Sequence, residues 1–375
     1  MVPSPPRPDP APGRAPPRRA GGPLAWLRRN LFATPASTLA TLLVGAGLAR
    51  VLPAVIRWLF TGAVYRPDYA ACRGLEYRAA CWGFVAEEHR LILFGRYPYG
   101  EQWRPLVATL LVVGALGLSA HPRSWRRWLL PLWALVLAAF LGLLHGGVLG
   151  LSLVDPGLWG GLPLTVILTL IGVGASIPLG IVLALGRRSR LPLARSTATL
   201  YIELVRGVPL ITVLFVASFV FPLLLPQGFR LDVLARVAIA ITLFQAAYMA
   251  EVVRGGLQAL PRGQTEAAES LGLSWWQTQR KVILPQALVL VIPSFVNSLL
   301  STFMDTSLVT VVSMYDLTGA LRLALGDPQW RNFFIEGYLF VGAIYFSSCL
   351  LMSRYGQWLE RRLGRWAWRK EPTGA

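Results

Sequence analysis

QTEAAESLGLSWWQTQRKVILPQ, residues 264–286, is a polar, helix-forming stretch between two long apolar runs of the chain. Gly272 follows the helix-forming residues, and a glycine at that place supplies the left-handed conformation in which helices commonly end. Ser274 and Gln277 have the spacing of a capping box, which starts a second short helix. Pro285 is expected to stop that helix and to begin the next apolar run. The sequence therefore predicts a helix, a tight turn and a second helix.

The composition of the whole chain is that of a membrane protein. Of its 375 residues, 54% are hydrophobic and 14% are charged, and the mean hydropathy is +0.52. Soluble domains carry about 25% charged residues. The net charge of +18 is compatible with nucleic-acid binding, but the basic residues lie in short segments that flank apolar runs, as they do in membrane proteins. We therefore expect no nucleic-acid partner.

Eight runs of the chain are apolar enough to cross a membrane. A helix needs about 20 residues to cross a hydrocarbon core about 30 Å thick. We therefore predict an all-α, polytopic membrane protein with about eight transmembrane helices. The predicted spans are residues 37–60, 105–121, 129–148, 163–185, 208–226, 232–253, 287–312 and 335–354.

Arginines decide the predicted orientation. They gather in the N-terminal tail, in the loop HPRSWRRW, in the loop GRRSRLPLAR and in the C-terminal tail. With eight spans, all four segments fall on one side of the membrane, and short basic loops remain in the cytoplasm. Both termini and the stretch 264–286 are therefore expected to be cytoplasmic.

Four regions are predicted along the chain. The N-terminal tail is rich in Pro, Ala and Arg, cannot bury a core and is expected to be disordered. The regions are the basic N-terminal tail (1–35), an extension with three spans (36–150) that includes an outer segment (65–104), a core with five spans (151–357) that includes a cytoplasmic loop (254–286), and a basic C-terminal tail (358–375).

The outer segment contains Cys72 and Cys81. An oxidising compartment permits a disulfide between them, but the sequence does not supply the geometry that a disulfide requires, so pairing stays open. Glu87, Glu88 and His89 follow one another in the same segment, and consecutive residues of a helix do not share a face. A solvated surface patch is favoured there over a metal site, and no metal is expected.

The sequence lacks the signatures of common catalytic sites. It contains no GxSxG, no HExxH and no CxxC pair, and neither of its two lysines stands in a GxxxxGK[ST] phosphate loop. We therefore expect that the chain is not an enzyme and that it does not hydrolyse ATP by itself.

Residues of the stretch 264–286 resemble a known family. Val282 stands where the family signature EAA-x3-G-x9-I-x-LP, found in ABC importer permeases, has isoleucine. The other positions of the signature match, and they are Glu266, Ala267, Ala268, Gly272, Leu284 and Pro285. YIELVRGVPLI and DTSLVTVVSMYDL resemble the polar amino-acid branch of these permeases, and the three extra N-terminal spans resemble its general L-amino-acid members. The resemblance covers most of the chain.

The resemblance implies a permease subunit of an ATP-driven importer in the inner membrane of a bacterium, with a five-helix, MetI-like core. The six matching residues of the loop would form the surface that couples the chain to a separate pair of ATPase subunits. ATP and Mg²⁺ would bind those subunits, so this chain would need no cofactor. A periplasmic binding protein would deliver a polar L-amino acid, and a second, homologous permease subunit would complete the pathway through the lipid.

Two other classes of function remain open from the residues alone. One is a secondary carrier, and the other is a membrane-embedded enzyme; neither would work through an ATPase. A secondary carrier has no evident use for the loop, and many carriers contain an inverted repeat of broken helices, which this sequence does not show. An enzyme would need a polar constellation, which the sequence does not show either.

One polar helix face is a candidate substrate pathway. In the span 287–312, six polar residues fall within an arc of about 140°, and they are Ser294, Asn297, Ser298, Ser301, Thr302 and Asp305. An unpaired carboxylate within a span is costly, so Asp305 is expected to face a polar cavity. Gln245 and Tyr248 in the preceding span are further candidates. The alternative is that the hydroxyl groups bond to their own backbone and that the amide and phenol groups serve packing between helices.

Overall fold

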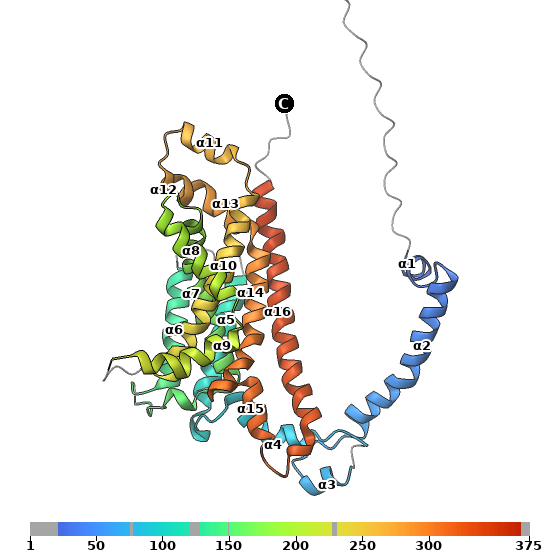
Figure 1. Ribbon diagram of the computed structural model, residues 1–375. Helices are drawn as coiled ribbons and strands as arrows, with labels where there is room; N and C mark the ends of the chain where they lie inside the picture. Colours follow the sequence, from blue (N-terminus) through green and yellow to red (C-terminus); the bar gives the residue numbers. More distant parts are fainter. Residues whose placement is uncertain (1–21, 76–77, 121–127, 149, 227–230, 369–375) are drawn as a thin grey trace, which may run out of the picture. The chain divides into compact units, whose positions relative to one another are not determined.

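The computed structural model describes residues 22–75, 78–120, 128–148, 150–226 and 231–368 (Figure 1). In these residues the protein is helical apart from a two-residue strand, β1 (Tyr315–Asp316). The predicted all-α class is therefore confirmed.

The helices differ widely in length. The longer ones are α2 (Pro35–Ile56), α5 (Trp103–Ala120), α6 (Leu129–His145), α7 (Gly161–Arg187), α8 (Pro192–Arg206), α10 (Val233–Ala259), α14 (Ile292–Asp305) and α16 (Phe334–Trp368). The shorter ones are α1 (Pro23–Asn30), α3 (Tyr69–Arg73), α4 (Gly83–Phe94), α9 (Leu210–Phe215), α11 (Gly263–Ser270), α12 (Trp275–Thr278), α13 (Leu284–Leu290) and α15 (Leu317–Ala324). Tighter or wider helical turns are η1 (Arg57–Thr61), η2 (Tyr99–Glu101), η4 (Pro156–Leu158), η5 (Val216–Val220), η6 (Phe221–Leu224), η7 (Gln279–Ile283), η8 (Thr306–Val312) and η9 (Arg331–Phe333).

Each predicted span coincides with helical structure, but the count of eight crossings is not established. Six helices of the described residues are long and apolar enough to cross a membrane. A seventh crossing results if Pro192–Arg206 and Leu210–Leu224, which are bent by 103° against each other, form one span. The remaining candidate, α6, has 17 residues and is therefore about 26 Å long, somewhat shorter than a hydrocarbon core of about 30 Å.

The chain forms two compact units. The first consists of residues 1–64 and 73–80, and the second of residues 65–72 and 81–375. The second unit holds α5 and α6 together with the five spans that the sequence assigns to the core. The predicted boundary at residue 150 is therefore not a boundary between these units, and it stays a prediction about the family's common core.

The predicted N-terminal tail contains more helix than expected. Residues 1–21 lie outside the described residues, but the rest of the tail includes α1, which corrects the expectation of disorder over 1–35. Pro23 lies in the first turn of α1, where its fixed φ suits a helix start, and Arg28 and Arg29 lie in its last turn, where cations are favourable. In the basic C-terminal tail, α16 continues to Trp368.

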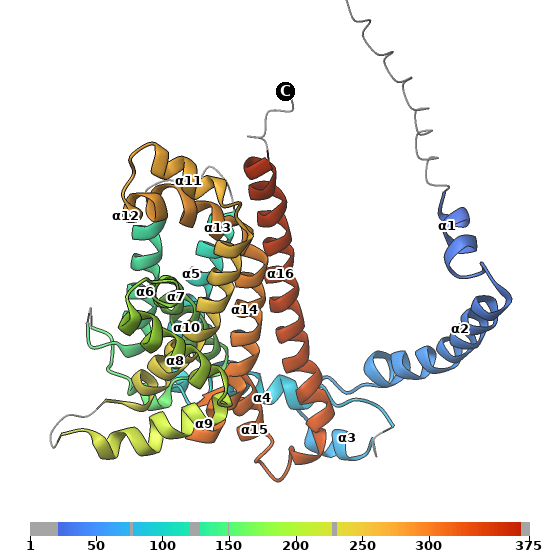
Figure 2. The ribbon, with the colours of Figure 1, turned by 45° about the horizontal axis from the view of Figure 1, so that its top comes forward.

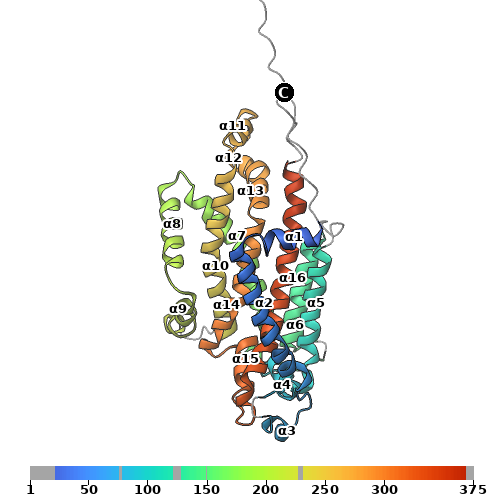
Figure 3. The same ribbon diagram turned by 90° about the vertical axis from the view of Figure 1, so that its right-hand side faces the viewer.

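Helices α7 and α10 form the centre of the second unit (Figures 1 and 2). Gly172 and Gly180 allow the two helices to approach closely: a Cβ atom at Gly180 would lie 2.5 Å from the Cβ of Met249, and one at Gly172 would lie 2.6 Å from Ile241. Small residues at such crossings are typical of membrane helices, because close backbone packing replaces the hydrophobic effect there. Figure 3 shows α10 between α8 and α14, which both contact it.

The C-terminal end of α6 is bonded to Tyr97, to Arg104 of α5 and to the chain that follows α6. The last four carbonyl groups of a helix have no partner within it, and all four are satisfied here. The donors are Gly146 N to Gly142 O (2.9 Å), Arg104 Nε to Leu143 O (2.6 Å), the Tyr97 hydroxyl to Leu144 O (2.9 Å) and Val154 N to His145 O (2.8 Å). Burial is the main cause that raises the pKa of Tyr97 to about 12, so its hydroxyl remains a donor at physiological pH.

Replacing Tyr97 by phenylalanine is expected to destabilise the folded protein. The change removes the hydroxyl donor and leaves the buried Leu144 carbonyl unpaired, which costs about 1–3 kcal/mol. The thermal unfolding midpoint of the purified protein in detergent measures the effect. Tyr99→Phe is the matched control, because the Tyr99 side chain is exposed and its hydroxyl makes no hydrogen bond within the described residues. Equal midpoints for both variants would contradict this role of Tyr97.

Candidate functional site

The stretch 264–286 has the predicted helix, turn and helix. Helix α11 ends at Ser270, and Gly272 has a φ of +76°. Gly272 N donates to Glu269 O (2.9 Å) and Leu273 N donates to Ala268 O (3.2 Å), which closes the end of the helix. Both halves of the capping box between Ser274 and Gln277 are present at the start of α12.

Pro285 does not stop the second helix, which corrects the sequence prediction. Helix α12 passes through η7 into α13 without interruption, and Pro285 lies in the first turn of α13. The turn η7 is a π turn, in which Leu284 N donates to Gln279 O. This wider turn accommodates a residue that has no N–H to donate to the preceding turn. The helix is interrupted later, at Val291. Helix α14 then begins at Ile292, with Pro293 in its first turn.

The tip of this loop is exposed and partly apolar. Glu266 and Ala267 are exposed, as are Leu271 (81%), Trp275 (48%) and Trp276 (68%). The Glu266 carboxylate makes no ion pair with any described residue. Exposed apolar side chains gathered on one loop are typical of a surface that contacts another protein. We name residues 263–278 the coupling loop, after the role that the family resemblance implies for them.

Three residues of the predicted coupling set differ in their surroundings. Ala268 is 3% exposed, so it does not lie on the surface that the resemblance implies for the six signature residues. Leu284 is half-buried and belongs to the hydrophobic packing beneath the loop, whereas Pro285 is exposed.

The segment that follows the coupling loop attaches it to the bundle by packing against α10. Ile283 and Ala287 lie in one buried cluster with Val253 and Leu257 of α10. Gly256 allows close contact as well, because a Cβ atom there would lie 2.8 Å from the Ala287 carbonyl oxygen. The segment that follows the coupling loop is therefore packed directly against the end of α10.

The structure divides the polar face of α14 into two edges. Thr302 is buried, its hydroxyl donates to Ser298 O (2.8 Å), and the Gln245 side-chain amide donates to the Thr302 hydroxyl oxygen. Gln245 is also buried. This pair therefore joins α10 to α14, which is the packing role that the sequence left open.

The other edge of α14 is accessible. Ser294, Asn297 and Ser301 are exposed, and Asp305 is half-buried at the end of the helix. In the described part of the chain, the Asp305 carboxylate has neither a hydrogen-bond nor an ion-pair partner. Tyr248 lies elsewhere: its ring packs against Phe244 (5.0 Å between centroids) and under the Arg206 guanidinium (5.6 Å). These contacts involve α10 and α8, so the structure does not join Tyr248 to the polar edge of α14.

Asp316 is a buried residue that the sequence interpretation missed. Its carboxylate accepts hydrogen bonds from Gly319 N (2.8 Å) and the Tyr345 hydroxyl (3.0 Å). Burial raises the pKa of Asp316, against the lowering effect of these bonds. The residue caps α15 and connects the segment after η8 to α16. An aspartate just before an apolar helix is a recognisable N-cap signal, which could have identified it.

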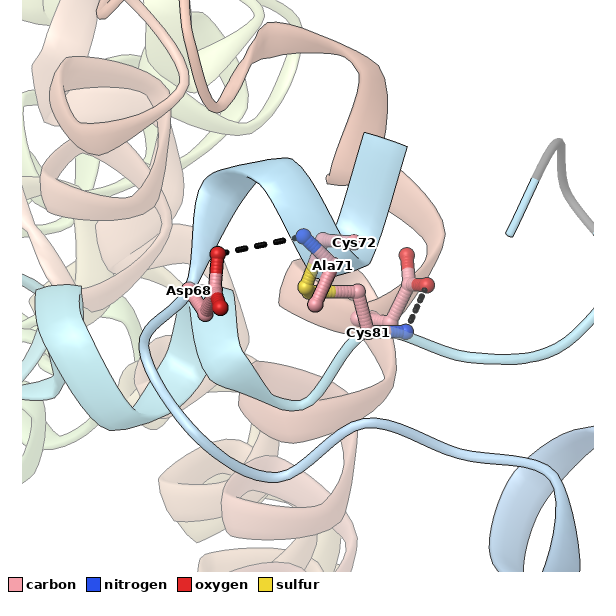
Figure 4. Close-up of a disulfide and its surroundings, with 5 residues drawn as sticks. Asp68, Ala71, Cys72 and Cys81 are labelled. Atoms are coloured by element: carbon pink, nitrogen blue, oxygen red, sulfur yellow. Dashed lines mark hydrogen bonds between the residues drawn. A yellow bond between two sulfur atoms is a disulfide. The ribbon is translucent and has the colours of Figure 1, made fainter. Parts of the chain in front are cut away.

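In the outer segment, Cys72 and Cys81 are joined by a disulfide, with their Cα atoms 5.5 Å apart. Figure 4 shows it beside Asp68, whose carboxylate accepts a hydrogen bond from Ala71 N (3.1 Å). Cys81 N donates to the carboxylate of Glu336 (2.8 Å), which is buried in the first turn of α16. The disulfide loop is thereby connected to the core.

Glu87, Glu88 and His89 are consecutive residues of α4. No cluster of three His, Cys, Asp or Glu side chains that could hold a metal ion occurs within the described ranges. Glu88 is partly buried, and burial, followed by the nearby charges of Asp327 and Glu87, raises its pKa.

The family is shown by the sequence itself. Residues 176–365 match the family described as "Binding-protein-dependent transport system inner membrane component". The chain belongs to this family. The residues matched include α10, the coupling loop and the polar face of α14. This permease is therefore an inner-membrane protein of a transport system that depends on a binding protein.

Two relatives match nearly the whole length of this permease. "Inner membrane amino-acid ABC transporter permease protein YhdY" of Escherichia coli is 42% identical over 347 residues, which cover 90% of this chain and 92% of the relative. "Glutamate/glutamine/aspartate/asparagine transport system permease protein BztC" of Rhodobacter capsulatus is 36% identical over 420 residues, with 95% and 96% coverage. The extension before the family match is thus shared with these relatives.

A solved structure is also similar to part of this permease. It is described as "Crystal structure of an amino acid ABC transporter with histidines" and is 30% identical, with a TM-score of 0.49. The match covers 54% of this chain and 92% of the other.

Gly272→Val is expected to abolish transport while the protein remains inserted in the membrane. A Cβ atom at Gly272 would meet no neighbour within 4 Å, so the effect comes from the backbone alone. A positive φ costs a residue with a side chain about 1–2 kcal/mol, and a β-branched one is disfavoured further. Asparagine tolerates this conformation, so Gly272→Asn is the matched control. Uptake of labelled substrate per inserted protein is the measurement, and undiminished uptake by Gly272→Val would refute a role of this turn in coupling.

Proposed function

We propose that this chain is the permease subunit of an ATP-driven importer that carries polar L-amino acids from the periplasm into the cytoplasm. The observation that carries the proposal is the coupling loop, an exposed helical pair with apolar side chains at its tip and a buried attachment to α10. The names of the two full-length relatives support amino acids as the substrate class.

The partners follow from this role. A pair of ATPase subunits binds the coupling loop on the cytoplasmic side and supplies the site for ATP and Mg²⁺, so this chain holds neither. Glu266 and Ala267 face that partner together with Trp275 and Trp276, and Gly272 sets the angle between the two short helices. Leu284 and Pro285 set how the loop continues into α13. Both termini lie in the cytoplasm, on the side of the basic loops.

A second permease subunit covers the polar edge of α14. Polar side chains that face lipid are costly, so they normally face a partner or a water-filled cavity. Helix α14 would lie in the interior of such a two-subunit complex. Its exposed polar residues are Ser294, Asn297 and Ser301, and Asp305 lies at its end. We assign this edge to the wall of the substrate pathway, with Asp305 as a partner for a cationic group such as the α-ammonium of an amino acid.

ATP-driven closure of the ATPase pair would displace the coupling loop. Because Ile283 and Ala287 share a buried cluster with Val253 and Leu257, the displacement passes to α10. Helix α10 is bonded to α14 through Gln245 and Thr302, so the wall of the pathway moves with it. The pathway would then open alternately to the two sides of the membrane.

Uptake by cells that lack this protein tests the function. Cells complemented with the wild-type chain are expected to take up several labelled L-amino acids, and the uptake is expected to stop when the partner ATPase carries a substitution that prevents ATP hydrolysis. Uptake that is independent of the ATPase would favour a secondary carrier. Unimpaired uptake by the deletion strain, with other transporters of these substrates removed, would contradict the proposal.

Asp305→Asn is expected to weaken the interaction with the substrate. Hydrogen bonds to charged groups contribute about 1.5–3 kcal/mol, so the apparent affinity should fall about ten- to a hundredfold. The concentration dependence of uptake measures this. Asp327→Asn is the matched control: Asp327 is exposed in the loop before η9 and accepts a hydrogen bond from Gln329 N, which an asparagine oxygen can also accept. An Asp305→Asn variant with unchanged affinity and rate would remove Asp305 from the pathway.

A further inference from the structure

Five charged side chains from three helices form a connected cluster near the coupling loop. Arg187 is the last residue of α7, Glu203 and Arg206 lie in the last turn of α8, and Glu251 and Arg254 lie about two turns before the end of α10. We name these five residues the charge cluster. None of its members belongs to the family signature of the loop.

Glu251 is the centre of the charge cluster. One of its carboxylate oxygens lies 2.7 Å from Arg187, and the other lies 2.7 Å from Arg254 and 3.8 Å from Arg206. Arg187 uses its second terminal nitrogen to bind Glu203 at 2.8 Å. Glu251 therefore joins α7 to α10 directly, and it also forms a longer ion pair with Arg206 of α8.

The two glutamates of the cluster are in different environments. The Glu251 side chain is 15% exposed, whereas that of Glu203 is 55% exposed and forms its ion pair with Arg187. Exposed ion pairs contribute little, whereas the loss of one partner from a largely buried group leaves the remaining charges uncompensated. With three arginines and two glutamates, neutralising Glu251 would leave three guanidinium groups facing a single, exposed carboxylate.

The charge cluster and the segment that follows the coupling loop hold the same part of α10 from different sides. Val253 and Leu257 pack against the segment that continues the loop, and Glu251 and Arg254 make the ion pairs. At about 100° per residue, these two pairs point away from the helix axis in different directions. A displacement that enters α10 from the loop is therefore resisted by the bonds to α7 and α8.

We propose that Glu251 is a positioning residue for the coupling of ATP hydrolysis to transport. By holding the ends of α7, α8 and α10 as one block, it makes a displacement of the coupling loop move the three helices together. Without it, α10 follows the loop alone and the displacement is not converted into opening of the pathway. This inference rests on the proposed function.

The ratio of amino acid imported to ATP hydrolysed tests the inference. Both rates are measured in the same vesicles, which contain this chain, its ATPase pair, the second permease subunit and the binding protein, and they are normalised to the inserted complex. Glu251→Gln, which keeps the shape and removes the charge, is expected to leave ATP hydrolysis within about twofold of wild type and to lower import about tenfold. The ratio then falls about tenfold, which loss of folded protein alone would not cause.

Three further variants sharpen the test. Glu203→Gln is the matched control, because the same chemical change at an exposed member of the cluster is expected to leave the ratio within about twofold of wild type. Glu251→Asp keeps the charge and is expected to restore most of the ratio. If Glu251→Gln is not inserted, Arg187→Gln takes its place, because it removes the bonds from α7 to both glutamates, and it is expected to lower the ratio in the same way.

Other outcomes would overturn the inference. Import and hydrolysis that fall in proportion in Glu251→Gln would make its role structural only, and equal ratios in Glu251→Gln and Glu203→Gln would exclude a special role for Glu251. In both cases ATP-dependent import by the wild-type complex would leave the proposed function intact. A wild-type complex that imports no amino acid with ATP would overturn the proposed function and this inference together.

Discussion

The close packing of α7 against α10 is the constraint on which the rest of the second unit depends. Between membrane helices the hydrophobic effect contributes little, and stability comes from close contact of backbones and from hydrogen bonds. Gly172 and Gly180 provide the contact, because a methyl group at either position would overlap with α10. The helices α8 and α14 are then placed against this pair, and the coupling loop is placed by the end of α10.

Helix α10 of this pair connects the coupling loop with the polar face of α14. Toward the coupling loop, α10 packs against Ile283 and Ala287, and toward the middle of the bundle it bonds to α14 through Gln245 and Thr302. Packed protein interiors do not deform continuously, so a shift at one end of such a helix is transmitted along it. One helix therefore links the proposed surface for the ATPase to the wall of the proposed pathway.

The extension adds connections on the outer side of the second unit. Its disulfide loop binds Glu336 at the start of α16, and Arg96 donates to Gly157 O (2.9 Å) and lies over the ring of Tyr315 (4.9 Å). Tyr315 and Asp316 also pair with Gly160 and Gly161 at the start of α7. The contacts of Tyr315 and Asp316 hold the backbone that follows η8. The residues of the extension that belong to the second unit therefore pack with the ends of α7 and α16 and with β1.

The sequence by itself determined the features that depend on neighbouring residues. The turn at Gly272, the cap between Ser274 and Gln277 and the apolar runs all follow from local chemistry, and the structure contains each of them. The sequence did not predict that the helix continues through Pro285. A proline can follow a π turn as well as a helix end, and the residues alone do not decide between the two.

Only the tertiary structure decided which faces of the helices meet. It buried Ala268, paired Thr302 with Gln245, joined Cys72 to Cys81 and divided the polar arc of α14 into a packed edge and an exposed one. It also brought Arg187 to Glu251, which lie 64 positions apart in the chain. Such contacts depend on the crossing of distant helices, and helical periodicity shows which residues share a face but not which helix that face will contact.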